Sequence, residues 1–143
     1  MRGQRELCML LATPLLIIPF ALYNLAMAGL FGDGGVGVLD NEVMAVHMLS
    51  GTDWTMAFGD LLILIALVLL FVEILKATRP GSRALLDHML SMVLFVVFLV
   101  EFLLVQGAAT QIFFILMTIC FIDVIAGFTV SIRTAGRDVS IGL

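Results

Sequence analysis

Three carboxylates lie within long apolar stretches of this sequence: Glu73, Glu101 and Asp123. A carboxylate that faces hydrocarbon is costly, so each is expected to face other helices, a partner subunit or water. Acids in such positions can hold helices together through hydrogen bonds, or they can carry a proton or an ion through a membrane. The choice between these two kinds of chemistry depends on the elements that position the acids.

The composition indicates an integral membrane protein. Of the 143 residues, 62% are hydrophobic and the mean hydropathy is +1.21, whereas soluble domains use about 45–50% apolar residues. A chain of this size fits one membrane domain, residues 1–143, with too little polar sequence for a separate soluble module. The net charge of −4 says little about partners, because a membrane divides the charges between two compartments.

Four apolar runs predict an all-α membrane protein, built as a bundle of four transmembrane helices. A helix needs about 20 residues to cross a core roughly 30 Å thick. The spans are expected at residues 7–31, 60–78, 84–105 and 110–132. The second span is long enough only if Lys76 extends its ammonium toward the interface. In the first span, Pro14 and Pro19 predict a kink.

The distribution of Lys and Arg predicts the orientation of the bundle. Every basic residue lies near a chain end or within residues 76–84, and the remaining loops have none. The loop 79–83, the tail 133–143 and both termini are therefore expected on the cytoplasmic side. A cleaved signal peptide is the alternative for the N-terminus, because Arg2 and Arg5 precede an apolar run, but that run is longer than a usual signal core.

The loop of residues 32–59 predicts a small periplasmic β-hairpin between the first two spans. Segments 43–49 and 52–57 are apolar-rich and flank the turn residues Ser50 and Gly51. We expect the hairpin to rest on the outer helix ends, with Trp54 and Tyr23 at the membrane interface. Asp60 is expected to be the N-cap of the second helix.

The ionisable residues fall into two predicted layers. The intramembrane polar cluster comprises Glu73, Lys76, His88 and Asp123, and the outer polar layer comprises Asn24, Asp60 and Glu101. Glu73 and Asp123 lie at a shared depth, roughly 20 Å below the outer face by the helical rise. Lys76 follows Glu73 on one helical face. Asp87 and His88 also admit a simpler interpretation, as groups near a helix start that complement the dipole or reach the interface.

Other chemistry finds little support in the sequence. Cys8 and Cys120 form neither a disulfide framework nor a metal-ligand spacing, and no phosphate-binding, dinucleotide-binding or hydrolase motif occurs. A b-type haem needs two facing histidines, and His88 alone qualifies unless two copies associate. We therefore expect no enzymatic activity, no cofactor, no metal and no nucleic-acid partner.

Four passages carry a resemblance to a known group of proteins: MLLATPLLIIPFALYNL, SGTDWTMAFGDLL, EILKATRPGSRALLDHMLSM and IDVIAGFTVSIRTAGRDV. Together they resemble small four-span inner-membrane proteins of alphaproteobacteria, over most of the chain. The resemblance implies a bacterial inner-membrane location and carries no known activity. Small multidrug transporters also have four short helices, but they are marked by a glutamate within the first helix, and here no acid follows Glu6 in the first run.

Two classes of function remain. The first is a non-enzymatic accessory or scaffold subunit, in a larger membrane complex or a homo-oligomer. The second is a small oligomeric transporter or channel, coupled to protons or ions through Glu73 and Asp123. Four helices are too few to enclose a wide pathway alone, so the second class requires a dimer or a larger assembly.

Overall fold

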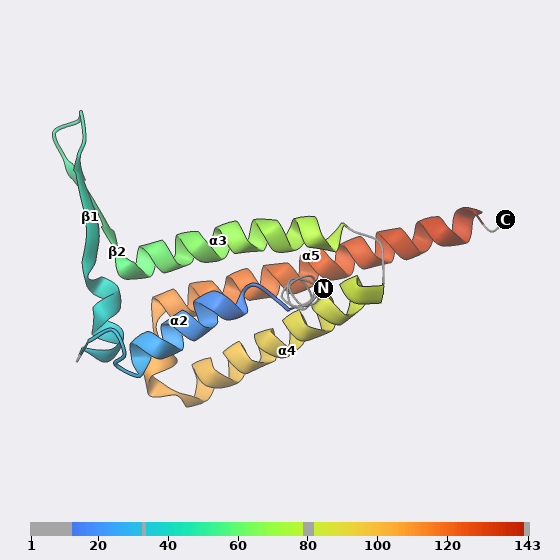
Figure 1. The fold of residues 1–143 in the computed structure, drawn as a ribbon, viewed down its shortest axis with the longest axis horizontal. Helices are drawn as coiled ribbons and strands as arrows, with labels where there is room; N and C mark the ends of the chain where they lie inside the picture. The colour runs from blue at the N-terminus through green and yellow to red at the C-terminus, as the bar shows by residue number, and fades with distance from the viewer. Residues whose placement is uncertain (1–12, 33, 79–81, 142–143) are drawn as a thin grey trace, which may run out of the picture.

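The computed structural model describes residues 13–32, 34–78 and 82–141, and Figure 1 shows a helical bundle with one projecting hairpin. The elements in chain order are α2 (Ile17–Met27), η1 (Gly35–Asp40), β1 (Glu42–His47), β2 (Asp53–Ala57), α3 (Phe58–Ala77), α4 (Ser82–Leu104), η2 (Gln106–Ala108) and α5 (Gln111–Ile141). We call the end of the bundle that bears the hairpin the outer end, and the opposite end the inner end.

Three helices are long and apolar enough to cross a membrane: Phe58–Ala77, Leu85–Leu104 and Gln111–Arg133. They correspond to the second, third and fourth predicted spans. α2 has only 11 residues, and a helix of that length extends roughly 16 Å. Residues 1–12 contain the start of the first predicted span and lie outside the described residues, so the fourth span stays a prediction.

The described part of the first predicted span is helical only from Ile17 onward. α2 begins at Ile17, after Pro14, so Pro14 does not lie within this helix. Pro19 is the third residue of α2, a position where the missing N–H has no partner within the helix to lose. Residues 13–16 are consequently non-helical, and their backbone groups need partners elsewhere.

Buried residues recur at helical spacing on α3 and α4, which both pack against α5. On α3 they include Leu62, Ala66, Leu70, Glu73 and Ala77, and on α4 Asp87, Ser91, Leu94 and Phe98. In the outer half of the bundle an aromatic cluster fills the core: the ring of Phe113 lies 4.8 Å from that of Tyr23 and 5.2 Å from that of Phe98. Each stripe is therefore apolar toward the outer end and polar toward the inner end.

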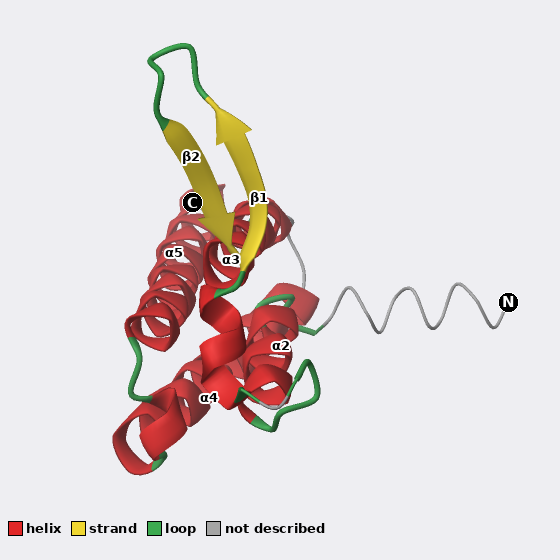
Figure 2. Cartoon of the chain, turned by 90° about the vertical axis from the view of Figure 1, so that its left-hand side faces the viewer, coloured by secondary structure: helices red, strands yellow, loops and turns green. Residues whose placement is uncertain are grey.

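The predicted hairpin is present. β1 and β2 are antiparallel, Val46 pairs with Trp54, and Gly51 takes a positive φ of 82° in the connecting turn. The hairpin does not rest on the helix ends as expected. Every residue of β1 is exposed, and Figures 1 and 2 show the strands extending sideways, across the direction of the helices.

Two expectations about single residues need correction. α3 begins at Phe58, so Asp60 is its third residue rather than the N-cap, and its carboxylate accepts the backbone N–H of Ala57 at 3.0 Å. Tyr23 does not face the membrane interface, because its side chain is fully buried in the bundle. Its hydroxyl finds polar partners within the protein, as described below.

Candidate functional site

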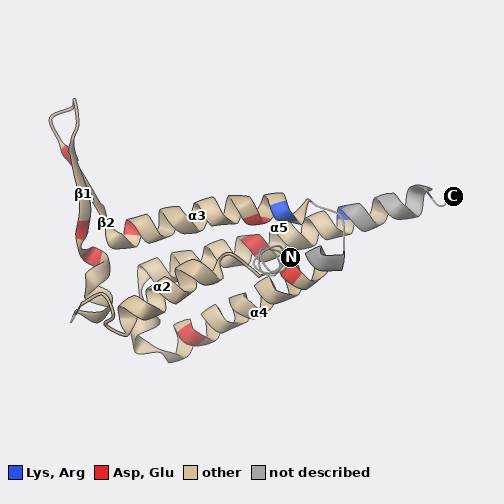
Figure 3. Ribbon diagram, in the orientation of Figure 1, with Lys and Arg blue, Asp and Glu red and all other residues tan. Residues whose placement is uncertain are grey.

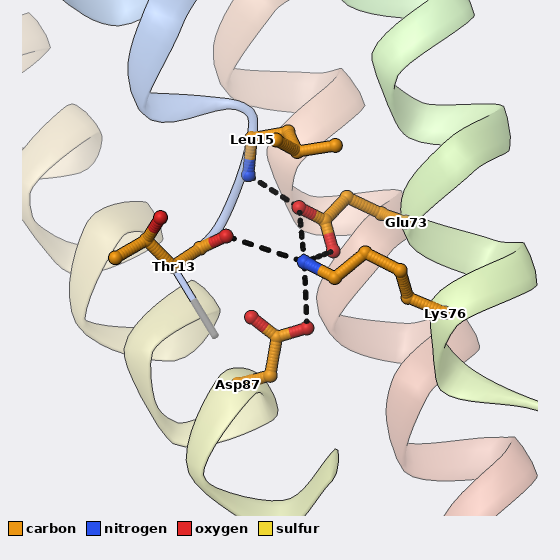
Figure 4. A network of polar contacts seen from close by, with 5 residues as sticks. All are labelled: Thr13, Leu15, Glu73, Lys76 and Asp87. Atoms are coloured by element: carbon orange, nitrogen blue, oxygen red, sulfur yellow. Dashed lines mark hydrogen bonds and ion pairs between the residues drawn. The ribbon is translucent and has the colours of Figure 1, made fainter. Parts of the chain in front are cut away.

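A network of ionisable groups lies at the inner end of the bundle, with the Lys76 ammonium at its centre (Figure 4). The Lys76 Nζ lies 3.1 Å from Oε2 of Glu73, on the same helix, and 3.1 Å from Oδ2 of Asp87 on α4. It also donates to the backbone carbonyl of Thr13 at 3.2 Å. One cation therefore binds groups from three separate segments of the chain.

Two backbone groups take part in this network because the residues just before α2 are not helical. The N–H of Leu15 donates to Oε1 of Glu73, while the carbonyl of Thr13 accepts from Lys76. Backbone that is not helical at membrane depth is tolerated only where protein or water satisfies it. Glu73 and Lys76 satisfy the N–H of Leu15 and the carbonyl of Thr13, so the ion pair stabilises the non-helical segment before α2.

Asp123 of α5 lies beside this network. Its carboxylate is hydrogen-bonded to the side chain of Ser91 on α4, and Asp87, His88 and Lys76 are all near enough to interact with it electrostatically. The thiol of Cys120, one helical turn earlier, faces the backbone carbonyl of Ser91 at 3.9 Å. Polar contacts therefore also join α4 to α5. They lie near the ion pair of Lys76 and Asp87, which joins α3 to α4.

Not every polar atom in this region is satisfied. Within the described part of the chain, Oδ1 of Asp87, Nε2 of His88 and Oδ2 of Asp123 are buried without a hydrogen-bond partner. Among the described residues, three carboxyls (Glu73, Asp87 and Asp123) lie near the single ammonium of Lys76.

The ring of His88 packs closely against Gly127 of α5. A Cβ placed on Gly127 of α5 would lie only 2.2 Å from Nδ1 of His88 and 2.4 Å from its Cε1. The imidazole therefore fills space that the glycine leaves open, and no larger residue fits at this position without displacing the ring.

All four residues of the predicted inner cluster lie at the inner end of the bundle. Glu73 and Lys76 contact each other directly, whereas Asp123 and His88 lie beside them without a direct bond to that pair in the described residues. Asp87 was assigned to a helix terminus, but it is only 6% exposed and binds Lys76. The sequence contains a signal for the burial of Asp87, because this residue continues the buried stripe of α4 at helical spacing.

The outer polar layer forms only in part. Asn24 donates to Oε2 of Glu101 at 3.4 Å, and also to the backbone carbonyl of Phe20 at 3.1 Å. Asp60 makes its local bond to Ala57 and is exposed. Figure 3 shows the separation of the layers, with acidic residues of α3, α4 and α5 near the inner end and a further acidic position on α4 toward the outer end.

A second polar contact at the outer end is not predicted by the sequence analysis and involves the hydroxyl of Tyr23. The Tyr23 hydroxyl donates to the backbone carbonyl of Gly107 at 2.9 Å and lies 2.6 Å from Oγ1 of Thr110. Thr110 immediately precedes α5, and its hydroxyl accepts the backbone N–H of Phe113 at 3.2 Å, as an N-cap does. α2 is thereby joined to the start of α5.

The described residues contain no group of three or more His, Cys, Asp or Glu side chains arranged to hold a metal ion. Comparison of the chain with protein-family models, curated proteins and solved structures finds no match. The fold and the site define a class only: a helical bundle with three apolar helices of membrane length and a polar network at one end. Its function must be argued from its own residues.

Proposed function

We propose that the chain is a non-enzymatic integral membrane protein that serves as an accessory or scaffold subunit of a membrane complex or of a homo-oligomer. The observation that carries this proposal is the position of Lys76, whose ammonium binds Glu73, Asp87 and the carbonyl of Thr13 together. A cation held by three segments at once is suited to fixing a bundle, because moving it would leave buried carboxylates unpaired.

The exposed surface supports the same proposal. α3 turns large apolar side chains outward, namely Leu64, Leu67, Val68, Phe71 and Leu75, and α5 does so with Phe114, Phe121, Ile122, Ile125 and Phe128. Apolar surface of this extent is unfavourable in water and suits contact with lipid or with the helices of other subunits. The bundle lies in the bacterial inner membrane, with its inner end and both termini on the cytoplasmic side, in agreement with the distribution of Lys and Arg.

The test is extraction of the tagged full-length chain from its own membrane into lipid-retaining particles, followed by native mass spectrometry. The proposal predicts particles that hold additional subunits or several copies of the chain. A tagged, unrelated inner-membrane protein of similar size serves as the control for accidental co-purification. Recovery of a single 15.5 kDa chain with lipid alone, also after cross-linking in intact membranes, would contradict it.

A second function is favoured by the unpartnered atoms: a small oligomeric proton- or ion-coupled transporter or channel that uses Glu73 and Asp123. In the described part of the chain, Oδ2 of Asp123 is buried without a partner. A buried acid with a free oxygen, beside two further acids, is the arrangement that proton relays in membranes use. This function also requires several copies, because the described helices pack around a filled core.

Conservative variants separate the two functions. Under the scaffold proposal, Glu73→Gln and Asp123→Asn should retain most of the stability, since an amide oxygen still accepts, whereas Asp123→Ala should lose roughly 1–2 kcal/mol of helix association. Under the transport proposal, the two amide variants should fold and assemble normally but abolish pH-dependent flux in reconstituted vesicles. Proton flux in the unmodified protein that both amide variants remove would favour transport, and its absence would favour the scaffold.

A further inference from the structure

The hairpin between α2 and α3 has one apolar face and one polar face. The register pairs Met44 with Met56 and Val46 with Trp54, and because side chains alternate along a strand, these four lie on one face. On the opposite face Ala45 pairs with Thr55, and His47 pairs with Asp53 through a contact of 2.6 Å. The regularly paired part of the hairpin, residues 44–47 with 53–56, is therefore amphipathic, although it packs against the bundle only at its base.

The base of the hairpin is firmly joined to the bundle. β2 ends at Ala57 and α3 begins at Phe58, with no linker between them. The backbone N–H of Phe58 donates to the carbonyl of Asn41 at 2.9 Å, and the N–H of Ala57 donates to Asp60 at 3.0 Å. Gly59 packs so closely that an added Cβ would lie 2.3 Å from Cδ1 of Ile112. The direction of the strands is thus set by the start of α3.

That direction lies across the helices. Figure 1 shows the strands running from the outer end of α3, across the direction of that helix and away from the rest of the bundle. Figure 2, which views the molecule from the hairpin side, shows the two strands next to each other. The two faces of the hairpin therefore point along the bundle axis, one toward the inner end and one away from it. A bilayer crossed by α3 would have its surface parallel to this hairpin.

The apolar face is uncovered in the described structure. Met44, Val46 and Trp54 are 44%, 41% and 43% exposed, and Leu49 at the tip is fully exposed. An isolated two-stranded hairpin is at best marginally stable in water and needs a surface to pack against. The outward side of α3 also exposes large apolar side chains, namely Leu64, Leu67 and Phe71.

We propose that the hairpin lies flat on the outer surface of the bilayer beside α3, with the face of Met44, Val46, Trp54 and Met56 in the headgroup region. This inference rests on the membrane placement of the proposed function. Tryptophan favours that depth because its ring is apolar and its N–H is polar. The unpaired backbone groups of the strand edges can bond to interfacial water there, which they could not do deeper in the bilayer. The pair of His47 and Asp53 then faces the aqueous phase.

Trp54 is the single tryptophan of the chain, so its fluorescence reports directly on this face. The full-length protein is reconstituted in phosphatidylcholine–phosphatidylglycerol vesicles and exposed either to iodide in the water or to lipids brominated on the acyl chain near the headgroup. The proposal predicts strong quenching by the brominated lipids and weak quenching by iodide. The matched control moves the probe to the opposite face by W54F with T55W, and it should reverse the pattern, with several-fold stronger quenching by iodide.

A further probe separates failure of this inference from failure of the membrane placement. F71W with W54F places the only tryptophan on the outward side of α3, where Phe71 is exposed. If this probe is quenched by lipids brominated deep in the acyl chain but Trp54 is quenched by iodide, the hairpin inference is wrong and the membrane placement stands. If the F71W probe is also quenched by iodide alone, the membrane placement itself is wrong. A third outcome is that neither quencher reaches Trp54, and that this protection is lost when the protein is diluted into more lipid. That outcome would assign the face to a second copy of the chain and overturn the proposal.

Discussion

Gly127 of α5 leaves the space that the His88 ring of α4 occupies. Because an added Cβ would lie 2.2 Å from Nδ1 of His88, Gly127→Ala is expected to lower the free energy of unfolding by about 1–3 kcal/mol through overpacking. Unfolding in mixed detergent micelles, followed by circular dichroism, measures the change. His88→Ala should relieve most of the loss in the double variant.

Gly136 offers the matched control on the same helix. In the described structure nothing lies within 4 Å of a Cβ built at Gly136, so Gly136→Ala should be neutral or should stabilise by up to about 1 kcal/mol through helix propensity. Equal effects of the two glycine substitutions would show that the contact between His88 and Gly127 does not form.

The Tyr23 hydroxyl is predicted to stabilise the outer end. Tyr23→Phe removes the bonds to Gly107 and Thr110 but keeps the ring against Phe113, and it should cost about 1–2 kcal/mol of unfolding free energy. Denaturation of the two proteins in the same lipid mixture measures the difference. Thr110→Ser retains the hydroxyl and should cost little, and a Tyr23→Phe protein as stable as the original would refute the assignment.

Individual contacts were predictable where they are local. Glu73 and Lys76 are three residues apart on one helix, so the sequence alone indicates their pairing. Tyr23 was assigned to the membrane interface because its ring is amphipathic, but its partners lie 84 and 87 residues away in the chain. Asp87 was missed for a related reason: its proximity to a helix start offered a sufficient local explanation, while its partner Lys76 is on another helix.

Among the elements, the hairpin turn depends on Gly51. Its φ of +82° is a conformation that side-chain-bearing residues rarely adopt, so Gly51→Ala should destabilise the turn by about 1–2 kcal/mol. The backbone N–H of Met48, which donates to Thr52 at 2.9 Å, should then exchange with deuterium faster, whereas helix amides should be unchanged. Gly37→Ala is the control, since Gly37 has no positive φ. Unaltered exchange at Met48 would contradict the turn.

The sequence predicts whether a segment forms a helix or a hairpin better than it predicts the direction in which that element extends. The hairpin was predictable because apolar segments flank a Ser-Gly pair, and three spans were predictable from length and hydropathy. The sideways direction of the hairpin was not, because it depends on packing at Gly59 against Ile112 and Leu39. Prolines in the first predicted span indicate only a kink. They do not indicate that Glu73 and Lys76 satisfy backbone groups of the non-helical residues 13–16.

For the whole molecule, the proposed orientation predicts the side of the membrane on which each segment lies. Reporter domains fused after Arg79 or Leu143 should be active in the cytoplasm, and one inserted near Gly35 should be active in the periplasm, because basic residues are retained on the cytoplasmic side. Paired reporters that are active on opposite sides provide the internal control. A periplasmic C-terminus would rule out this orientation.

In the inner polar network, Lys76 is expected to hold the bundle together by neutralising an acid on another helix. The most direct measurement is a double-mutant cycle of Lys76→Met and Asp87→Asn in reversible unfolding from lipid–detergent micelles. Lys76→Met alone should cost about 3–5 kcal/mol, because it leaves buried carboxylates unpaired, and the double variant should lose about 1–3 kcal/mol less than the sum of the single losses.

Asp60 provides the control for this cycle, because it is exposed at the far end of the helix that carries Lys76. Losses from Lys76→Met and Asp60→Asn should add without coupling. If the Lys76 ammonium binds Asp87, the coupling between these two residues should be well above that of the control pair. Losses for Lys76 and Asp87 that simply add would contradict it, since the ammonium would then not bind the Asp87 carboxylate in the folded protein.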